Sequence, residues 1–347
     1  MQEIAFRKRI VFCRRGVGHI PKELTHWHIA REALRRGIPQ EVGEIIASNL
    51  PLYYIGAIVH DMAFYDLSKT SEASIERFAN QLHGVAGEDT LAPLIEIMEM
   101  ALSQTNKQAS LAFLLGMLTH FVADSMFHPM IYYMSGNYFA DDQKERSKAV
   151  FRHRLLETAI DLWLQRVDPM EYPTNLNRLW REAGEPARQV FKLLVAKYTN
   201  HREKNIIVHF NKAWRNYRFL QTAFSWSIPY QVLTLFRRCG YSEAAKLEAL
   251  FYKQPLDLSF FDRTLDWLHP VTGEPNKMTL NQLYDLSVKK VIKLFNHLGK
   301  HSVEKWPFIL RELAPLSLDS GLTYVPVKKM KYFRKEPIEH SLGYEIA

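Results

Sequence analysis

Two segments of the chain carry histidine and carboxylate side chains at the same helical spacing. In LAFLLGMLTHFVADSMFHPM, which begins at Leu111, His120, Asp124 and His128 stand at i, i+4 and i+8. On a helix these positions lie near one face, drifting by about 40° per step. Their neighbours are apolar, so a buried Asp124 needs a partner, and a metal ion would satisfy it and bind imidazoles as well. A hydrogen-bonded His–Asp pair explains this one segment equally well.

The second segment, FRHRLLETAIDLWL, repeats the spacing with His153, Glu157 and Asp161. For Asp161 the better interpretation is an ordinary ion pair with an arginine of the same helix. That interpretation is poorer for His153 with Glu157. Two apolar helices with ligand-type stripes therefore favour a metal site between them.

Further candidate ligands lie upstream. Asp61 ends the apolar run YYIGAIVHD, and its neighbour His60 points in a different direction, so both rarely bind one ion. His83 stands in QLHGVAGEDT, which we interpret as a glycine-rich loop. His26 and His28 lie two apart on an expected helix and diverge by roughly 200°, so only one should face the site.

In chain order these motifs resemble the zinc-dependent phospholipase C family, to which the S1/P1-type nucleases are structurally related. The resemblance is carried by Thr-His at 25–26, Gly-x3-His-Asp at 56–61, His83, His-x3-Asp-x3-His at 120–128 and His-x3-Glu at 153–157. The segments Trp267-Leu-His-Pro-Val-Thr-Gly and Asp319-Ser-Gly-Leu resemble bacterial members more weakly. The resemblance implies a compact helical bundle that holds zinc.

Matched residue by residue, the family pattern implies three metal sites. The first set is Asp61, His83, His120 and Asp124; the second is His128, His153 and Glu157; the third is His26 with Asp124 as a bridge. In the secreted phospholipases an N-terminal tryptophan completes the third site, whereas this chain begins MQEIAF. We therefore expect two to three Zn²⁺ ions. His60 also departs from the family, where proline commonly precedes the aspartate.

The expected chemistry is hydrolysis of a phosphodiester. Clustered zinc ions bind phosphate oxygens and lower the pKa of a water molecule towards ~7. Asp61 is the candidate general base or water-orienting group, and no protein nucleophile is needed. The resemblance implies a phospholipase C that cleaves glycerophospholipids to diacylglycerol and a phosphorylated headgroup.

Three alternatives stay open. One is a nuclease on the same scaffold. Another is an HD-type phosphohydrolase that pairs His60 with Asp61. The third is a non-catalytic, metal-stabilised module that binds membranes or a protein.

Helical patterns dominate the chain and predict a mainly α fold. The resemblance implies a compact multi-helix bundle of the phospholipase C/P1 nuclease type, with a helical C-terminal extension. The expected helices are 24–36, 109–127, 144–165, 186–198, 214–238, 242–252, 280–298 and 303–313. Two stretches, 254–275 and 317–326, are expected to be loops. Pro169 and Pro173 suggest a soft boundary between a zinc-binding catalytic region, 1–168, and a C-terminal region, 169–347, packed on it.

The net charge of +8 is concentrated near the ends of the chain. It favours anionic partners, so we expect a phospholipid substrate and peripheral contact with anionic membranes, and we rank nucleic acid lower. Taken by itself, the charge is better explained by a solvated surface. Aromatic residues in the C-terminal half are expected to be helix core rather than a lipid-contact surface. They are Trp214, Tyr217, Phe219, Phe224, Trp226 and Tyr230.

Targeting and redox signals are few. No apolar run approaches the ~20 residues of a membrane-spanning helix, so we expect no transmembrane segment. No signal peptide is evident, which suggests a cytoplasmic protein or one exported by a signal-independent route. The two cysteines, Cys13 and Cys239, define no disulfide framework or thiolate site.

Overall fold

The computed structural model describes residues 23–67, 75–104, 106–172, 175–199 and 204–344. These residues form helices together with one two-stranded antiparallel sheet, β1 (Thr264–Leu268) with β2 (Pro275–Thr279). The mainly α prediction is therefore confirmed. The basic residues before Glu23 lie outside the described residues.

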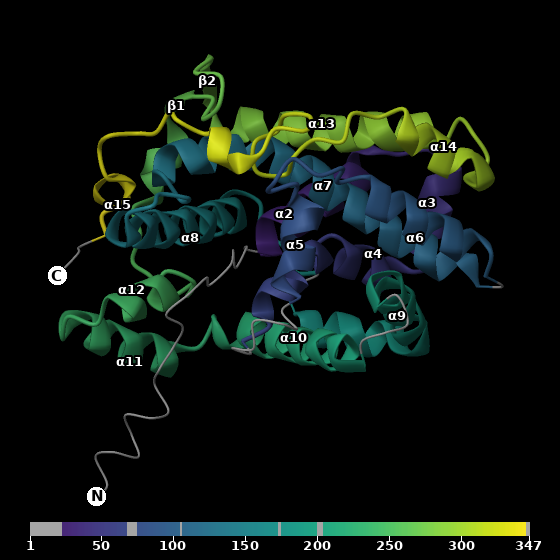
Figure 1. The fold of residues 1–347 in the computed structure, drawn as a ribbon, viewed down its shortest axis with the longest axis horizontal. Coiled ribbons are helices and arrows are strands. Elements are labelled where there is room, and N and C mark those ends of the chain that lie inside the picture. Colours follow the sequence, from purple (N-terminus) through teal and green to yellow (C-terminus); the bar gives the residue numbers. More distant parts are fainter. Residues whose placement is uncertain (1–22, 68–74, 105, 173–174, 200–203, 345–347) are drawn as a thin grey trace, which may run out of the picture.

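Helix α7 (Lys107–Ser135) forms the centre of the molecule (Figure 1). By length and composition it could cross a membrane, but 94% of its most apolar window is buried inside the protein. It contacts α2 (Glu23–Arg36), α4 (Leu50–Gly56), α6 (Ala92–Leu102) and α8 (Gln143–Val167). We therefore interpret α7 as the core helix around which the others pack.

Two glycines let α4 and α7 approach closely. A Cβ atom on Gly56 would lie 2.0 Å from the carbonyl oxygen of Phe113, and one on Gly116 would lie 2.0 Å from that of Tyr53. Neither distance is compatible with a side chain. Because Gly116 stands one turn before His120, this contact fixes the depth at which the first histidine of α7 sits.

The remaining elements form two flanks (Figure 1). On one side lie α13 (Leu280–Leu298), which begins with a Thr279–Gln282 capping box, and α14 (Trp306–Arg311). On the other side lie α9 (Leu176–Thr199), α10 (Lys204–Ala223) and α11 (Ser227–Arg238). The shorter elements are α3 (Gln40–Ala47), η1 (Val59–Tyr65), α5 (Glu76–His83), α12 (Ser242–Glu248), η2 (Leu258–Asp262), η3 (Val303–Lys305), η4 (Val327–Lys329) and α15 (Ile338–Ser341).

Two details of the predicted layout are wrong. The single helix expected over 214–238 is two helices, because α10 ends at Ala223 and Trp226 has extended backbone before α11. The loop expected over 254–275 contains η2 and β1, and the Thr272-Gly273 turn connects β1 to β2. Gly273 has a φ of 77°, which suits the turn that lets the hairpin form.

Candidate metal centre

The first cluster combines three elements. α7 supplies His120 and Asp124, η1 supplies Asp61, and the last residue of α5 is His83. All four are buried, and one ligand-type atom from each lies within 4.8 Å of the others. The closest pairs are His120 Nε2 to Asp124 Oδ2 at 2.9 Å and His83 Nε2 to Asp61 Oδ1 at 3.1 Å. The structure therefore brings together the four residues that the sequence assigned to one site.

His83 does not stand in a loop, as the glycine-rich sequence suggested. It ends α5, and Gly84 follows with a φ of 68°, the left-handed conformation that closes many helices. The glycine therefore terminates the helix at the point where the imidazole meets Asp61. The prediction of a loop at His83 is therefore wrong, and the loop begins one residue later, at Gly84.

The second cluster joins α7 to α8. His128, His153 and Glu157 are buried and offer ligand atoms within 4.8 Å of one another. Glu157 Oε1 lies 3.2 Å from His153 Nε2 and 3.6 Å from His128 Nε2. Because His128 and Asp124 share α7, the two clusters lie one helical turn apart.

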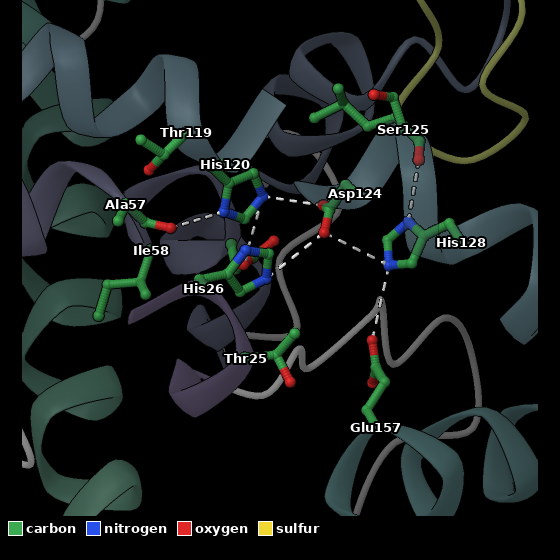
Figure 2. A network of polar contacts seen from close by, with 12 residues as sticks. Thr25, His26, Ala57, Ile58, Thr119, His120, Asp124, Ser125, His128 and Glu157 are labelled. Carbon is green, nitrogen blue, oxygen red and sulfur yellow. Dashed lines mark hydrogen bonds and ion pairs between the residues drawn. The ribbon is translucent and has the colours of Figure 1, made fainter. Parts of the chain in front are cut away.

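Asp124 lies between several imidazoles (Figure 2). Its Oδ1 is 3.4 Å from His26 Nε2 and 3.7 Å from His128 Nε2, while its Oδ2 is in the first cluster. The ring of His28 lies elsewhere, with Nδ1 3.4 Å from Arg31. Of the two histidines on α2, His26 is therefore the one placed against the cluster.

Among the described residues, no arginine of α8 forms an ion pair with Asp161, so the predicted pairing within the helix is wrong. Its carboxylate accepts hydrogen bonds from the backbone N–H groups of Leu24 at 3.1 Å and Thr25 at 2.7 Å. It also accepts one from Tyr252 Oη at 2.8 Å. The first N–H groups of a helix lack partners within that helix, and a carboxylate satisfies them well. Asp161 therefore anchors the start of α2, next to His26.

The outer hydrogen bonds of three imidazoles suit metal binding. Each ring directs Nδ1 to a backbone carbonyl oxygen: His83 to Ala79 at 2.7 Å, His120 to Ala57 at 2.9 Å, and His128 to Leu318 at 3.1 Å. An Nδ1–H that donates there leaves the lone pair of a neutral ring on Nε2. Those Nε2 atoms face carboxylate oxygens, so either a proton on Nε2 or a metal cation must lie between each pair.

Buried polar atoms that lack hydrogen-bond partners also indicate that the site fits a metal ion. Within the described residues, Asp61 Oδ2, Asp124 Oδ2, His120 Nε2 and Glu157 Oε2 are buried without a hydrogen-bond partner. Such groups are costly to bury unless a ligand satisfies them. Imidazole nitrogens and carboxylate oxygens are ligands that Zn²⁺ takes in proteins. The residues present therefore fit zinc.

The electrostatic environment also favours positive charge. Burial disfavours an imidazolium, but hydrogen bonds to Asp124 and Asp61 outweigh it and raise the pKa of His83 to about 10. Burial likewise disfavours a carboxylate, but His153 and His128 lower the pKa of Glu157 to about 2. Glu157 thus stays charged and attracts a cation, whereas burial raises the pKa of Asp61.

The sequence did not reveal that the segment after α14 completes the site. Leu318 donates its backbone N–H to the carbonyl oxygen of His83 at 2.8 Å and accepts from His128 Nδ1. Asp319, which is fully buried, places Oδ1 3.3 Å from His128 Nδ1 and accepts from Tyr132 Oη at 3.0 Å. The only signal was the weak similarity of Asp319-Ser-Gly-Leu to bacterial family members.

His60 takes a different place from its neighbour Asp61. Its ring stacks on that of His120, with centroids 4.4 Å apart and an interplanar angle of 5°. Burial lowers the pKa of His60 well below its usual value, so the ring is neutral. It belongs to neither ligand cluster formed by the described residues. The geometry therefore gives no support to an HD-type pair.

A pocket adjoins both clusters. Its polar wall is made by Thr25, His26, Asp124, His128 and Glu157, and its apolar wall by Phe127, Ile131 and Ile160. The aromatic side chains of Phe64, Tyr65 and Tyr132, which stand near the ligands in the sequence, are buried. Ligand-type groups thus share one pocket with apolar side chains.

A mainly α bundle with buried histidine–carboxylate clusters on both sides of Asp124 has the features of a helical metalloprotein. A comparison with known families matches residues 25–221, more than half of the chain, to the family described as zinc-dependent phospholipase C. The chain belongs to that family, and it is a zinc-dependent hydrolase of the phospholipase type. Comparisons with curated proteins and with solved structures found no match.

Proposed function

We propose that this protein is a phospholipase C, which hydrolyses the phosphodiester of a glycerophospholipid to diacylglycerol and a phosphorylated headgroup. One observation carries the proposal: Asp124 lies against ligand-type groups of both clusters, and that arrangement opens into a pocket with an apolar wall. The cavity is small, so it would hold a phosphate oxygen or a water molecule beside the ligands, with the acyl chains outside it.

The assignment of ligands follows the clusters. Asp61, His83, His120 and Asp124 would hold one zinc ion, and His128, His153 and Glu157 a second. His26 with Asp124 would help to hold a third, with further ligands needed from water or from residues outside the described ones. When bound, zinc supplies Lewis-acid chemistry that neutralises phosphate charge and acidifies water.

The side chains of the site would position the reactants. Asp61 is buried, and its Oδ2 lies 3.6 Å from His120 Nε2. We assign Asp61 to hold the attacking water or accept its proton. His26 lines the pocket, and burial lowers its pKa to about 3, so it is a neutral imidazole. Phe127, Ile131 and Ile160, which are buried, would exclude water from the reacting phosphate.

The test compares lipid with nucleic acid. Protein loaded with zinc is assayed on phosphatidylcholine, other glycerophospholipids and single-stranded DNA, and phosphorylated headgroup and diacylglycerol are quantified. We expect both products from lipid, loss of activity with a chelator, and its return with zinc. Asp61→Asn should abolish turnover, whereas His301→Ala, outside the clusters, should not. Cleavage of DNA without headgroup release would contradict this proposal and identify the protein as a nuclease.

A further inference from the structure

The outer faces of α10 and α11 carry an unusual share of the exposed apolar side chains. Among the described residues, eight of the thirteen large hydrophobic side chains that are exposed fall within residues 207–241. Five were not expected from any motif: Ile207, Val208, Ile228, Val232 and Leu235. Phe219 and Trp226 were expected in the helix core and are exposed instead, while Trp214, Tyr217 and Phe224 are buried as expected. The eighth is Tyr241.

On α11 these side chains form a stripe. Ile228, Val232 and Leu235 stand at i, i+4 and i+7, and they are 75%, 47% and 63% exposed. Tyr230 and Leu233, on the other face, pack against the core. No residue of α11 is fully buried. The helix is therefore held on one side and presents apolar side chains on the other.

The stripe continues onto α10. The rings of Phe219 and Trp226 meet with centroids 5.9 Å apart, which joins the end of α10 to the start of α11. Val208 and Arg215 stand on the outer face of α10 at helical spacing from Phe219 and are exposed. Figure 1 shows the two helices along one side of the molecule, opposite α13. We call the exposed residues Val208, Arg215, Phe219, Trp226, Ile228, Val232, Leu235 and Arg238 the α10–α11 face.

The charges of this region have one sign. Between Glu203 and Glu243 the sequence has six lysines and arginines and no aspartate or glutamate. Arg237 is paired with Glu248, whereas Arg215 and Arg238 are exposed. Apolar residues flanked by basic ones, without acidic ones, are typical of helices that lie on anionic lipid surfaces. A large exposed apolar patch also needs a partner.

The α10–α11 face is connected to the metal centre. α11 packs on α12, and α12 packs on α8. Thr158 of α8 donates its hydroxyl to the carbonyl oxygen of Ala249, just after α12, at 2.6 Å. Glu157 of the second cluster is the neighbouring residue. A surface that binds the α10–α11 face would therefore lie close to α8, which contributes Glu157 and Ile160 to the pocket.

We propose that the α10–α11 face docks the protein onto a phospholipid bilayer that contains anionic lipid. The choice of a bilayer over a protein partner rests on the proposed function and on the one-sided charge. Ile228, Val232 and Leu235 insert among the headgroups, and Arg215 and Arg238 contact lipid phosphates.

The binding experiment uses the full chain with Asp61→Asn, so that lipid is not consumed. Binding is measured by vesicle sedimentation on phosphatidylcholine alone and on phosphatidylcholine mixed with phosphatidylglycerol. Ile228→Ser/Leu235→Ser is expected to bind at least about tenfold more weakly, because burial of even one such side chain contributes about that factor. The matched control, Leu286→Ser/Phe308→Ser, removes exposed apolar side chains from the opposite side and should bind normally.

A second variant tests the charges. Arg215→Ser/Arg238→Ser should weaken binding to the mixed vesicles and leave binding to phosphatidylcholine unchanged, and salt should reduce the difference. Thermal unfolding and sedimentation velocity verify that each variant is folded and report its oligomeric state. The proposal is overturned by absence of vesicle binding in the parent, or by equal binding of the two double apolar variants. It is also overturned if Ile228→Ser/Leu235→Ser only dissociates a dimer.

An activity measurement separates this proposal from the proposed function. With Asp61 intact, Ile228→Ser/Leu235→Ser should cleave a monomeric short-chain phosphatidylcholine at the wild-type rate and vesicles at least about tenfold more slowly. If the wild-type protein cleaves neither, the phospholipase proposal fails, while the sedimentation result still decides whether the face binds membranes.

Discussion

Replacing Asp319 with asparagine keeps the shape of a buried side chain and removes its negative charge. Asp319 lies outside the matched family region, yet its Oδ1 is 3.3 Å from His128 Nδ1 and accepts from Tyr132 Oη at 3.0 Å. A carboxylate on the outer nitrogen of a metal-binding imidazole orients the ring and makes its inner nitrogen a stronger donor. We therefore expect Asp319→Asn to weaken the binding of zinc at the second cluster.

The size of the effect follows from the contacts. A hydrogen bond to a charged group contributes about 1.5–3 kcal/mol and a neutral one about 1 kcal/mol, so each contact loses roughly 1 kcal/mol. The contact of Asp319 with Tyr132 contributes to the stability of the fold, and its contact with His128 contributes to the affinity for zinc. Because Leu318 also accepts from His128 Nδ1 at 3.1 Å, the ring stays oriented. The expected loss of zinc affinity is about tenfold, the lower end of the outer-contact range.

The assay is a zinc titration of the chelator-treated protein against a chromophoric competitor, followed by thermal unfolding. His153→Ala, which deletes a candidate ligand, identifies the binding step of the second cluster. Asp319→Asn should shift that step and reduce the stabilisation by zinc by about 1.4 kcal/mol. Tyr132→Phe keeps the carboxylate and should bind zinc nearly as the wild type does. Wild-type affinity at that step in Asp319→Asn would refute the reasoning.

Three other substitutions test the scaffold. Asp124→Asn should lower the zinc content of both clusters and abolish turnover, because this carboxylate lies against imidazoles of both; a full metal count by elemental analysis would contradict its bridging position. Gly116→Ala should lower the free energy of unfolding by about 3 kcal/mol, since its Cβ would meet the carbonyl of Tyr53; an unchanged denaturation midpoint would contradict the close approach. Asp161→Asn should cost about 2 kcal/mol in the same denaturation assay by weakening its hold on Leu24 and Thr25, and a loss under about 0.5 kcal/mol would show that the carboxylate does not anchor α2.

The sequence predicts the ligand helices well because helical periodicity is local. Spacing alone places His120, Asp124 and His128 on one stripe, and the structure gives that stripe the expected place on α7. The same spacing placed Asp161 beside His153 and Glu157, but it could not show that its partners are backbone N–H groups of another helix. Periodicity determines which face a residue occupies, and tertiary packing determines what it meets there.

Other features depend on contacts that are distant in sequence. Leu318 contacts His128 although the two residues are 190 positions apart in the sequence. No local pattern in Ser317–Ser320 indicates that this segment accepts a hydrogen bond from an imidazole. The sequence also could not show the exposed face of α11, because the apolar residues of this helix have the composition of a core helix. Only the packing shows that one stripe of α11 is left outside.

Removal of zinc should therefore be detectable far from the ligands. Leu318 connects the two clusters, because its N–H donates to His83 while its carbonyl oxygen accepts from His128. When zinc no longer orients these rings, the segment from Leu316 to Thr323 loses much of what holds it, whereas α13 keeps its packing. Hydrogen exchange should accelerate in a peptide that covers 316–323 after chelation and recover on addition of zinc, with a peptide from α13 as control. Equal protection of 316–323 with and without zinc would mean that this segment is held independently of the metal centre.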